Sequence, residues 1–461
     1  MRGTHITRLS VEPGVGPWLG FWALSLSPVR KRMHPLFSLS ARLLLATTLL
    51  AGCQTTAAET TVNGNTATAA APTVTPATQP AQSFPEWLQD LRAEALSQGI
   101  RPATFDAAFA GVKLSDRVVE LDSSQPEFTR QVWQYIDSAA SDRRVQDGRR
   151  KIQENAALLR DISQRSGVPV EILAAFWGIE TNYGGSTGGF SVVEALTTLA
   201  YEGRRAAYFR NELLAALRIL DSGDIPLARM SGSWAGAMGQ TQFMPTVFLA
   251  HAVDEDGDGR RDIWDSLPDV FASTAAFVRA NGWRPGERWG EEVALPAGFA
   301  YDQAELSITK PLSEWRRLGV KPIGGGDLTG DGNAAILVLA GHQGPAFLVR
   351  DNYRAIMRYN PSTSYALAVA LLADRLEGRP GVVASWPRHE QPLSRTERIE
   401  LQERLAALGM APGTADGIVG ANTRAAVRRF QASVGAVPDG FATKALLDRL
   451  RAVSSTVQLP G

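Results

Sequence analysis

The sequence is poor in cysteine and has no excess of charge of either sign. Cys53 is the only cysteine in 461 residues, so an intrachain disulfide is excluded. Lysine plus arginine and aspartate plus glutamate both total 47, and this balance argues against a nucleic-acid-binding protein. The apolar run before Cys53, LLLATTLLAG, is too short to span a bilayer as a helix. A globular protein with room for two or three domains remains.

The N-terminal region has the order of a secretory signal. Basic residues at 30–32 precede the apolar run, and residues 1–53 are therefore predicted to be a signal region. The end of that run, LAGC, resembles a bacterial lipobox, which implies a lipid on Cys53. The following Gln54 implies a periplasmic protein anchored to the outer membrane, and Met33 is an alternative start. The competing interpretation is a short buried helix that ends in cysteine.

The rest of the chain divides by composition. Residues 54–84 are mostly threonine, alanine, proline and glutamine, which cannot bury a core, and are predicted to be a disordered tether. Apolar residues at helical spacing predict a largely helical domain over 85–378. Within it, AAILVLA and AFLVR flank GHQGP and predict a β-hairpin. A linker over 379–392 leads to a small separate unit over 393–452.

One glutamate occupies a position that helical periodicity assigns to a buried face. In VPVEILAAFWGIETNYGG, apolar residues recur along one face, and this face continues to Glu180. Gly184 and Gly185 are predicted to end the helix, so the carboxylate lies in the last turn. Apolar neighbours and the helix dipole there disfavour its charge. A carboxyl group that keeps its proton suits general acid catalysis. The alternatives are a side chain turned to water or one that caps a neighbouring helix.

The segment DEDGDGRRDIWD, residues 254–265, has the ligand spacing of a twelve-residue EF-hand loop. The ligand positions are Asp254, Asp256, Asp258, the Arg260 carbonyl, Asp262 and Asp265. Five aspartates this close repel one another without a cation, which predicts a structural Ca²⁺. The closing residue is aspartate rather than glutamate, which favours weak binding or an extra water ligand. The alternative is a solvated acidic turn.

Several motifs together resemble the lytic murein transglycosylase B family. They follow the family's order over about residues 85–378: WGIETNYG, Arg204-Arg205 with Tyr208-Phe209, GAMGQTQFMP, the acidic loop, and Arg358-Tyr359-Asn360 with Tyr365. The resemblance implies an α+β, mainly α, lysozyme-like catalytic domain in which Glu180 is the catalytic residue. It also implies sugar-binding roles for Ser233, Gln242, Tyr359, Asn360, Tyr365, Tyr135, Arg204 and Arg205.

Some of these residues have simpler interpretations. Asn360 precedes Pro361 and equally fits an N-cap with proline at the first helical position. Tyr365 equally fits a core position. Arg204 and Arg205 equally fit a solvated face, although carboxylates of the cell wall are suitable anionic partners for them.

The C-terminal unit resembles a three-helix peptidoglycan-binding domain. Asp416-Gly417 and Asp439-Gly440 are predicted to form tight turns. The predicted core consists of Leu401, Leu405, Leu408, Val427 and Phe430. The second Asp-Gly repeat lacks the glycine and threonine spacing of the first.

No other glutamate or aspartate nearby has the apolar setting of Glu180. Independently, the family resemblance implies a reaction that needs one carboxylate. Glycosidases usually employ two carboxylates. A lytic transglycosylase instead cleaves the MurNAc-GlcNAc β-1,4 bond of peptidoglycan to leave a 1,6-anhydroMurNAc end. The alternatives are a hydrolytic muramidase and a catalytically inactive murein-binding scaffold lipoprotein.

Overall fold

The computed structural model describes residues 82–124 and 131–457. The chain divides into two units, and all described residues belong to the one that contains 79–461. The predicted signal region, its Cys53 and nearly all of the predicted tether lie outside the described residues. Within the described ranges, no helix is long and apolar enough to cross a membrane.

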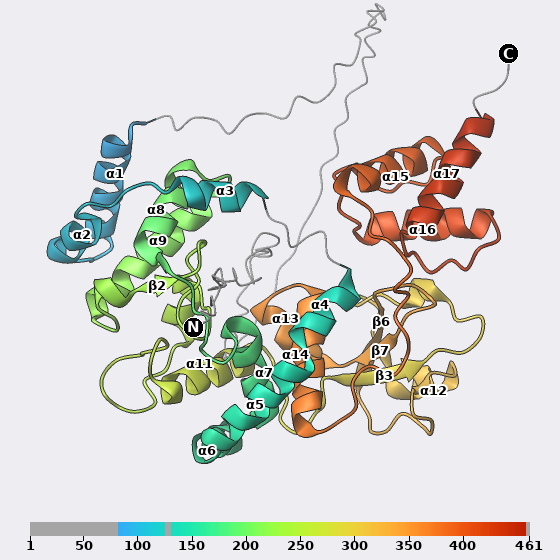
Figure 1. The fold of residues 1–461 in the computed structure, drawn as a ribbon, viewed down its shortest axis with the longest axis horizontal. Helices are drawn as coiled ribbons and strands as arrows, with labels where there is room; N and C mark the ends of the chain where they lie inside the picture. The colour runs from blue at the N-terminus through green and yellow to red at the C-terminus, as the bar shows by residue number, and fades with distance from the viewer. Residues whose placement is uncertain (1–81, 125–130, 458–461) are drawn as a thin grey trace, which may run out of the picture. The chain divides into compact units, whose positions relative to one another are not determined.

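The described chain is mainly helical, with a small β part (Figure 1). The helices before residue 300 are α1 (Phe84–Ser97), α2 (Pro102–Phe109), α3 (Asp116–Ser124), α4 (Val132–Ala139), α5 (Asp142–Glu154), α6 (Ala156–Ser166), α7 (Val170–Thr181), α8 (Val192–Glu202), α9 (Ala206–Ser222), α10 (Pro245–His251) and α11 (Leu267–Ala280). Those after it are α12 (Leu312–Arg317), α13 (Asp351–Tyr359), α14 (Thr363–Glu377), α15 (Arg395–Ala407), α16 (Ala421–Ser433) and α17 (Lys444–Val457). This mainly helical α+β fold is the one that the sequence predicts.

Helix α7 lies at the centre of the largest hydrophobic core. Every residue from 172 to 181 is buried, and the helix packs against α5, α6, α11 and α14. It begins at Val170, with Pro169 as the N-cap residue. Its predicted end is wrong, because Asn182 and Tyr183 already take positive φ angles of 52° and 60° ahead of the glycines. The close approach of the Tyr183 ring to Gly178 helps to hold this unusual turn, since a Cβ at Gly178 would lie 2.6 Å from that ring.

The β part is a five-stranded antiparallel sheet in the order β4-β6-β7-β3-β5. Its strands are β3 (Gly290–Ala294), β4 (Lys310–Pro311), β5 (Lys321–Pro322), β6 (Asn333–Val338) and β7 (Ala346–Val349). The predicted hairpin is confirmed by the pairing of β6 with β7. Side chains alternate along it: Leu337 and Phe347 face the main core, whereas Ile336 and Leu348 join a second core with Trp315. A separate two-stranded ladder joins β1 (Phe190–Ser191) to β2 (Ser231–Gly232).

A buried glutamate fixes the start of α10. This helix follows the glycine-rich segment GSWAGAMGQTQFM, residues 232–244. The N-cap residue, Met244, has no side-chain acceptor. Glu212 of α9 supplies one, because its carboxylate accepts bonds of 2.9 Å from the Thr246 backbone N–H and 2.7 Å from the Thr246 hydroxyl. The segment before α10 is thereby held against the helical core.

The last three helices, red in Figure 1, form a core of their own. Two equivalent pairs of hydrogen bonds, each between a glutamine and an Asp-Gly turn and here called a clasp, organise it. Gln402 donates to Asp416 Oδ1 and accepts from the Gly417 N–H at 2.8 Å. Gln431 makes the same pair of bonds with Asp439 and Gly440, at 2.7 and 2.8 Å. Both Asp-Gly turns therefore close against a glutamine of the preceding helix.

The second clasp also contacts the part of the chain before residue 379. Asp439 Oδ2 lies 2.9 Å from the backbone nitrogen of His342 and 2.6 Å from its Nδ1. Glu305 pairs with Arg424 at 2.7 Å and with Arg428 at 3.1 Å. The predicted linker also packs on the helical domain. The ring centroids of Trp386 and Trp133 lie 6.3 Å apart.

Candidate active site

The carboxyl group of Glu180 lies in the last turn of α7 and is 8% exposed. The Tyr365 hydroxyl, from α14, donates a hydrogen bond to Glu180 Oε1. Burial raises the pKa of Glu180 to about 8, while the Tyr365 bond acts in the opposite direction by stabilising the carboxylate. No carboxylate among the described residues contributes to this shift. Glu180 is therefore protonated at neutral pH, as its place on the apolar face predicts.

Three tyrosines lie around this carboxyl group. Tyr359, at the end of α13, stacks on Tyr365 with ring centroids 6.5 Å apart and planes 13° apart. Its hydroxyl donates to the Thr241 carbonyl, which ties it to the glycine-rich segment. Burial raises the pKa of Tyr135, Tyr359 and Tyr365, and the nearby Glu180 raises each further. All three phenols stay protonated, and those of Tyr359 and Tyr365 donate hydrogen bonds.

The glycine-rich segment contains two more predicted site residues. Gln242 takes a positive φ of 52°, and its side-chain nitrogen donates to the carbonyls of Thr187 at 3.0 Å and Gly239 at 2.8 Å. Ser233 Oγ accepts from the Ala237 N–H at 3.0 Å and closes a local turn. A left-handed non-glycine residue costs about 1–3 kcal/mol, so the surrounding bonds must hold Gln242 in place.

The other predicted residues have more structural partners. Asn360 accepts a 3.1 Å bond from the Ser362 N–H, and Ser362, not Asn360, is the N-cap of α14. The N-cap interpretation of Asn360 is therefore wrong, because the helix begins two residues beyond Pro361. Arg204 and Arg205 both bond to the buried Asp122. The Arg204 side chain is nevertheless 62% exposed, whereas that of Arg205 is 24% exposed.

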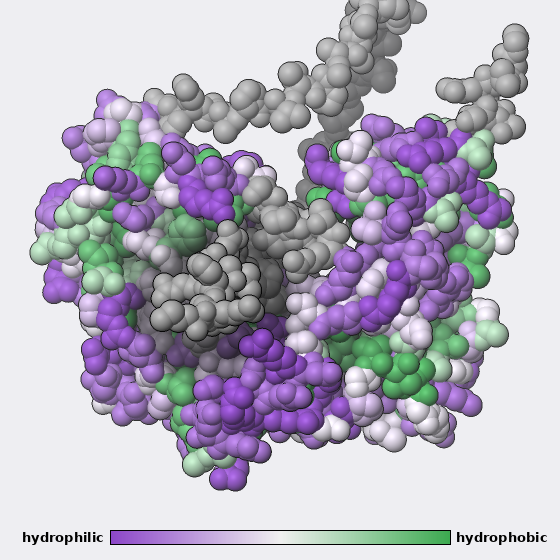
Figure 2. Space-filling view, viewed as in Figure 1, coloured by the Kyte–Doolittle hydropathy of each residue, from purple (hydrophilic) through white to green (hydrophobic). Residues whose placement is uncertain are grey.

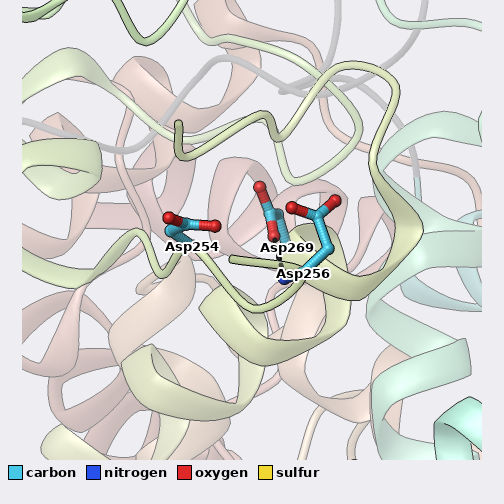
Figure 3. A group of neighbouring side chains, drawn as sticks. All are labelled: Asp254, Asp256 and Asp269. Atoms are coloured by element: carbon cyan, nitrogen blue, oxygen red, sulfur yellow. Dashed lines mark hydrogen bonds between the residues drawn. The ribbon is translucent and has the colours of Figure 1, made fainter. Parts of the chain in front are cut away.

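The acidic loop brings together three carboxylates that suit a cation. Oxygen atoms of Asp254, Asp256 and Asp269 lie within 4.8 Å of one another (Figure 3). Carboxylate oxygens are the ligands that Ca²⁺ prefers, so this donor set fits the predicted ion. Asp269, which follows the loop in the first turn of α11, is not among the predicted ligands.

The remaining predicted ligands have other partners. Asp258 pairs with Arg260 at 2.8 Å, and Asp265 forms an ion pair with Arg229. Asp262 Oδ1 accepts backbone bonds of 2.9 Å from Trp264 and Asp265. The carboxylate cluster thus contains Asp254 and Asp256 of the predicted set together with Asp269. A twelve-residue template ends before Asp269, which explains why the sequence did not indicate it.

Gln240, a further polar residue of the glycine-rich segment, makes contacts that the sequence did not predict. Its side chain joins Trp177 of α7 to the carbonyl of Trp264, with bonds of 2.7 and 2.8 Å. These partners lie 63 and 24 positions away in the chain, so local spacing carries no signal of the contact.

The visible surface of the described residues is mostly hydrophilic, with scattered hydrophobic patches (Figure 2). This distribution is ordinary for a folded protein in water. The aromatic residues around Glu180 are instead buried, with Tyr365 1% and Tyr359 6% exposed.

Comparisons with known proteins identify the family of this chain. Residues 83–374 match the model of the transglycosylase SLT domain, and residues 394–450 match that of a peptidoglycan binding domain. The membrane-bound lytic murein transglycosylase B of Escherichia coli (strain K12) is 36% identical over 211 residues, 44% of this chain. The chain spans 55% of the length of that curated relative.

Solved structures show the same fold. SltB3 from Pseudomonas aeruginosa, in complex with NAG-anhNAM-pentapeptide, is 52% identical with a TM-score of 0.79, over 80% of this chain and all of the other. The Escherichia coli lytic transglycosylase Slt35, in complex with calcium, is 29% identical with a TM-score of 0.56, over 63% of this chain and 92% of the other. The family model covers more than half of the chain, and this protein therefore belongs to the family defined by the transglycosylase SLT domain.

Proposed function

We propose that this protein is a lytic transglycosylase that cleaves the MurNAc-GlcNAc β-1,4 bond of peptidoglycan and leaves 1,6-anhydroMurNAc ends. The observation that carries the proposal is the single buried carboxyl group of Glu180, with its pKa raised to about 8 and no carboxylate partner acting on it among the described residues. A hydrolase of the usual kind needs a second carboxylate to activate water or attack the sugar.

In the proposed reaction Glu180 acts first as acid and then as base. Its proton passes to the glycosidic oxygen as the bond to MurNAc C1 breaks, and the acetamido oxygen of the same sugar stabilises C1. The C6 hydroxyl then attacks C1, and its proton returns to Glu180. The hydrogen bond from Tyr365 stabilises the carboxylate between these steps.

Purified sacculi provide the test of this function. Mass spectrometry of the released muropeptides should find anhydro ends, each one water lighter than the hydrolysed product. Released products with only reducing ends would indicate a muramidase. Binding to sacculi without release of any product would indicate an inactive scaffold.

The sugar-binding set is proposed to be Tyr359, Tyr365, Gln242, Asn360, Ser233 and Tyr135, with Arg204 and Arg205 further along the strand. The support is the position of the tyrosines around Glu180 and the fixed geometry of the glycine-rich segment. SltB3 is in complex with NAG-anhNAM-pentapeptide, a muropeptide, and muropeptides are the class of substrate proposed here.

A structural Ca²⁺ is proposed at the acidic loop, held by Asp254, Asp256 and Asp269. Their clustered carboxylates support it, as does the calcium complex of Slt35. An ion there would offset the mutual repulsion of these carboxylates and tie the loop to α11.

Localisation is proposed to be periplasmic, with a lipid on Cys53 as the anchor to the outer membrane. The sequence LAGC supports this, and the curated relative is named as membrane-bound. Residues 393–452 are proposed to bind peptidoglycan and keep the enzyme on its substrate, which agrees with their match to a peptidoglycan binding domain.

A further inference from the structure

The C-terminal end of the catalytic helix is held in an unfavourable conformation. Asn182 and Tyr183 are consecutive non-glycine residues with positive φ, directly after Glu180 and Thr181. Such residues persist only where the surrounding structure fixes them. The orientation of Glu180 in the last turn therefore depends on what holds this end of α7.

Gln240 binds this end of the helix from outside it, as the Arg144 carbonyl does through the Tyr183 hydroxyl at 2.9 Å. The Gln240 side-chain oxygen accepts from Trp177 Nε1 at 2.7 Å, and its backbone carbonyl accepts from the Thr181 hydroxyl at 3.3 Å. Trp177 lies less than one helical turn before Glu180, and Thr181 directly follows Glu180. Gln240 also packs closely on the turn, since a Cβ at Gly184 would lie 2.5 Å from its side-chain oxygen.

The same glutamine is bound to the exit of the acidic loop. Its backbone N–H donates to the Ile263 carbonyl at 2.8 Å, and its side-chain nitrogen donates to the Trp264 carbonyl at 2.8 Å. Gln240 thus makes two bonds to the end of α7 and two to residues 263–264.

Residues 263–264 are linked to the carboxylate cluster through Asp262, whose Oδ1 accepts from the Trp264 N–H at 2.9 Å. Asp269 accepts from the Asp262 N–H at 2.7 Å with one oxygen and from the Glu255 N–H at 2.7 Å with the other. One carboxylate of the cluster therefore closes both the entry and the exit of the loop. A continuous hydrogen-bonded path joins Asp269 to the residues on either side of Glu180.

We propose that Gln240 is a positioning residue that couples the acidic loop to Glu180, so that the conformation of the loop, and a cation bound there, determines how the catalytic carboxyl group is oriented. The catalytic part of this inference rests on the proposed function, whereas the coupling between loop and helix does not.

Three variants separate the bonds of Gln240. Gln240→Leu removes both side-chain bonds at similar volume. Gln240→Glu keeps an acceptor for Trp177 but loses the donor to the Trp264 carbonyl, and it is the second variant if the leucine variant fails to fold. Trp177→Phe removes only the indole donor. Asn352→Leu is the matched control, because Asn352 is a fully buried amide that bonds to residues 284 and 287 rather than to α7.

Kinetics on soluble muropeptides give the first result. Gln240→Leu should lower kcat by about 10-fold with little change in KM, since a small misplacement of a catalytic group has effects of this order or larger. The alkaline limb of its pH profile should move to lower pH, because a less buried Glu180 has a lower pKa. Gln240→Leu combined with Trp177→Phe should lose little more than either change alone. Asn352→Leu should leave the pH limb unchanged.

The indole N–H resonance of Trp177, assigned by its absence in Trp177→Phe, gives a result independent of the reaction. In the wild type it should shift on titration with CaCl₂, and in Gln240→Leu it should not, although calcium still raises the melting temperature of both. A folded Gln240→Leu or Gln240→Glu protein with wild-type kcat and pH limb would overturn the positioning role. The coupling would be overturned if the Trp177 indole resonance of the wild type did not shift with CaCl₂, or if it shifted equally in Gln240→Leu.

Discussion

At the residue scale, the proposed mechanism requires one carboxyl group to give up a proton and then recover it. Burial favours the protonated form of Glu180, and the Tyr365 hydroxyl favours the ionised form. The two effects oppose each other, which keeps the pKa within reach of physiological pH.

The single-carboxylate mechanism predicts the effect of Glu180→Gln. The amide keeps the size of the side chain but cannot exchange a proton, so release of anhydro products should fall by about 10²–10⁴-fold or more. Glu194→Gln is the control, because Glu194 lies in the first turn of α8 and has no proton transfer assigned to it. The rates should be compared at equal folded concentration. Near-wild-type release by Glu180→Gln, or an equal loss in the control, would contradict the assignment.

The raised pKa predicts a pH dependence of both activity and stability. Activity should fall as pH rises through about 8, because Glu180 then loses the proton that it donates. The folded state binds this proton more tightly than the unfolded state, whose pKa is near 4.5, so stability should fall as pH rises between these values. Denaturant unfolding at several pH values should show this fall, and Glu180→Gln should reduce it.

Removing the Tyr365 hydroxyl should shift the alkaline limb of the pH–activity profile to higher pH. Tyr365→Phe deletes the hydrogen bond that lowers the pKa of Glu180, so the limb should move to higher pH even though kcat decreases. The pH profile of the variant measures this directly. A shift to lower pH would mean that water enters the site and that burial is not the dominant cause.

The predictability of these residues depends on their separation in the chain. The burial of Glu180 was correctly predicted from the apolar face of its own helix. Tyr365, 185 positions away, came only from a family resemblance. Gln240 and Asp269 were not predicted as site residues, because their bonds join segments that no local pattern connects.

At the element scale, the β6–β7 hairpin was predicted because both strands are continuous apolar runs. The strands β4 and β5 have only two residues each, too few for any alternation to be seen. The end of α7 was misplaced because tertiary contacts, rather than the following glycines, stop the helix. Local rules identify elements that carry their own signal and miss those imposed by neighbours.

The acidic loop gives a prediction that separates the structure from the twelve-residue template. Melting temperature should rise with CaCl₂ and fall again with chelator, since an ion that binds only the folded state stabilises it. Asp254→Asn should abolish the response. Asp265→Asn should keep it, because Asp265 pairs with Arg229 and lies outside the carboxylate cluster. Loss of the response in Asp265→Asn alone would favour the template over the structure.

At the scale of the whole molecule, the C-terminal unit can be removed at a defined point. A chain that ends at Gln391 keeps Trp386 against Trp133 and Arg388 paired with Asp137 at 2.6 Å. It should cleave soluble muropeptides at a rate close to that of the full chain but be retained less on sacculi. A pull-down that retains both proteins equally would show that residues 393–452 do not bind the wall.

The first described residues, finally, determine where a mechanical load would enter the fold. The Tyr201 hydroxyl of α8 bonds to the Gln82 carbonyl at 3.0 Å, and its ring lies 5.3 Å from Phe84 and 5.6 Å from Trp87. Arg210 of α9 lies over the Trp87 ring. Tension on a chain anchored ahead of this point would pass to α1, α8 and α9, while α7 is braced by α5, α6, α11 and α14. With the proposed anchor on Cys53, a pull from the membrane would therefore reach α1, α8 and α9 before the helix that carries Glu180.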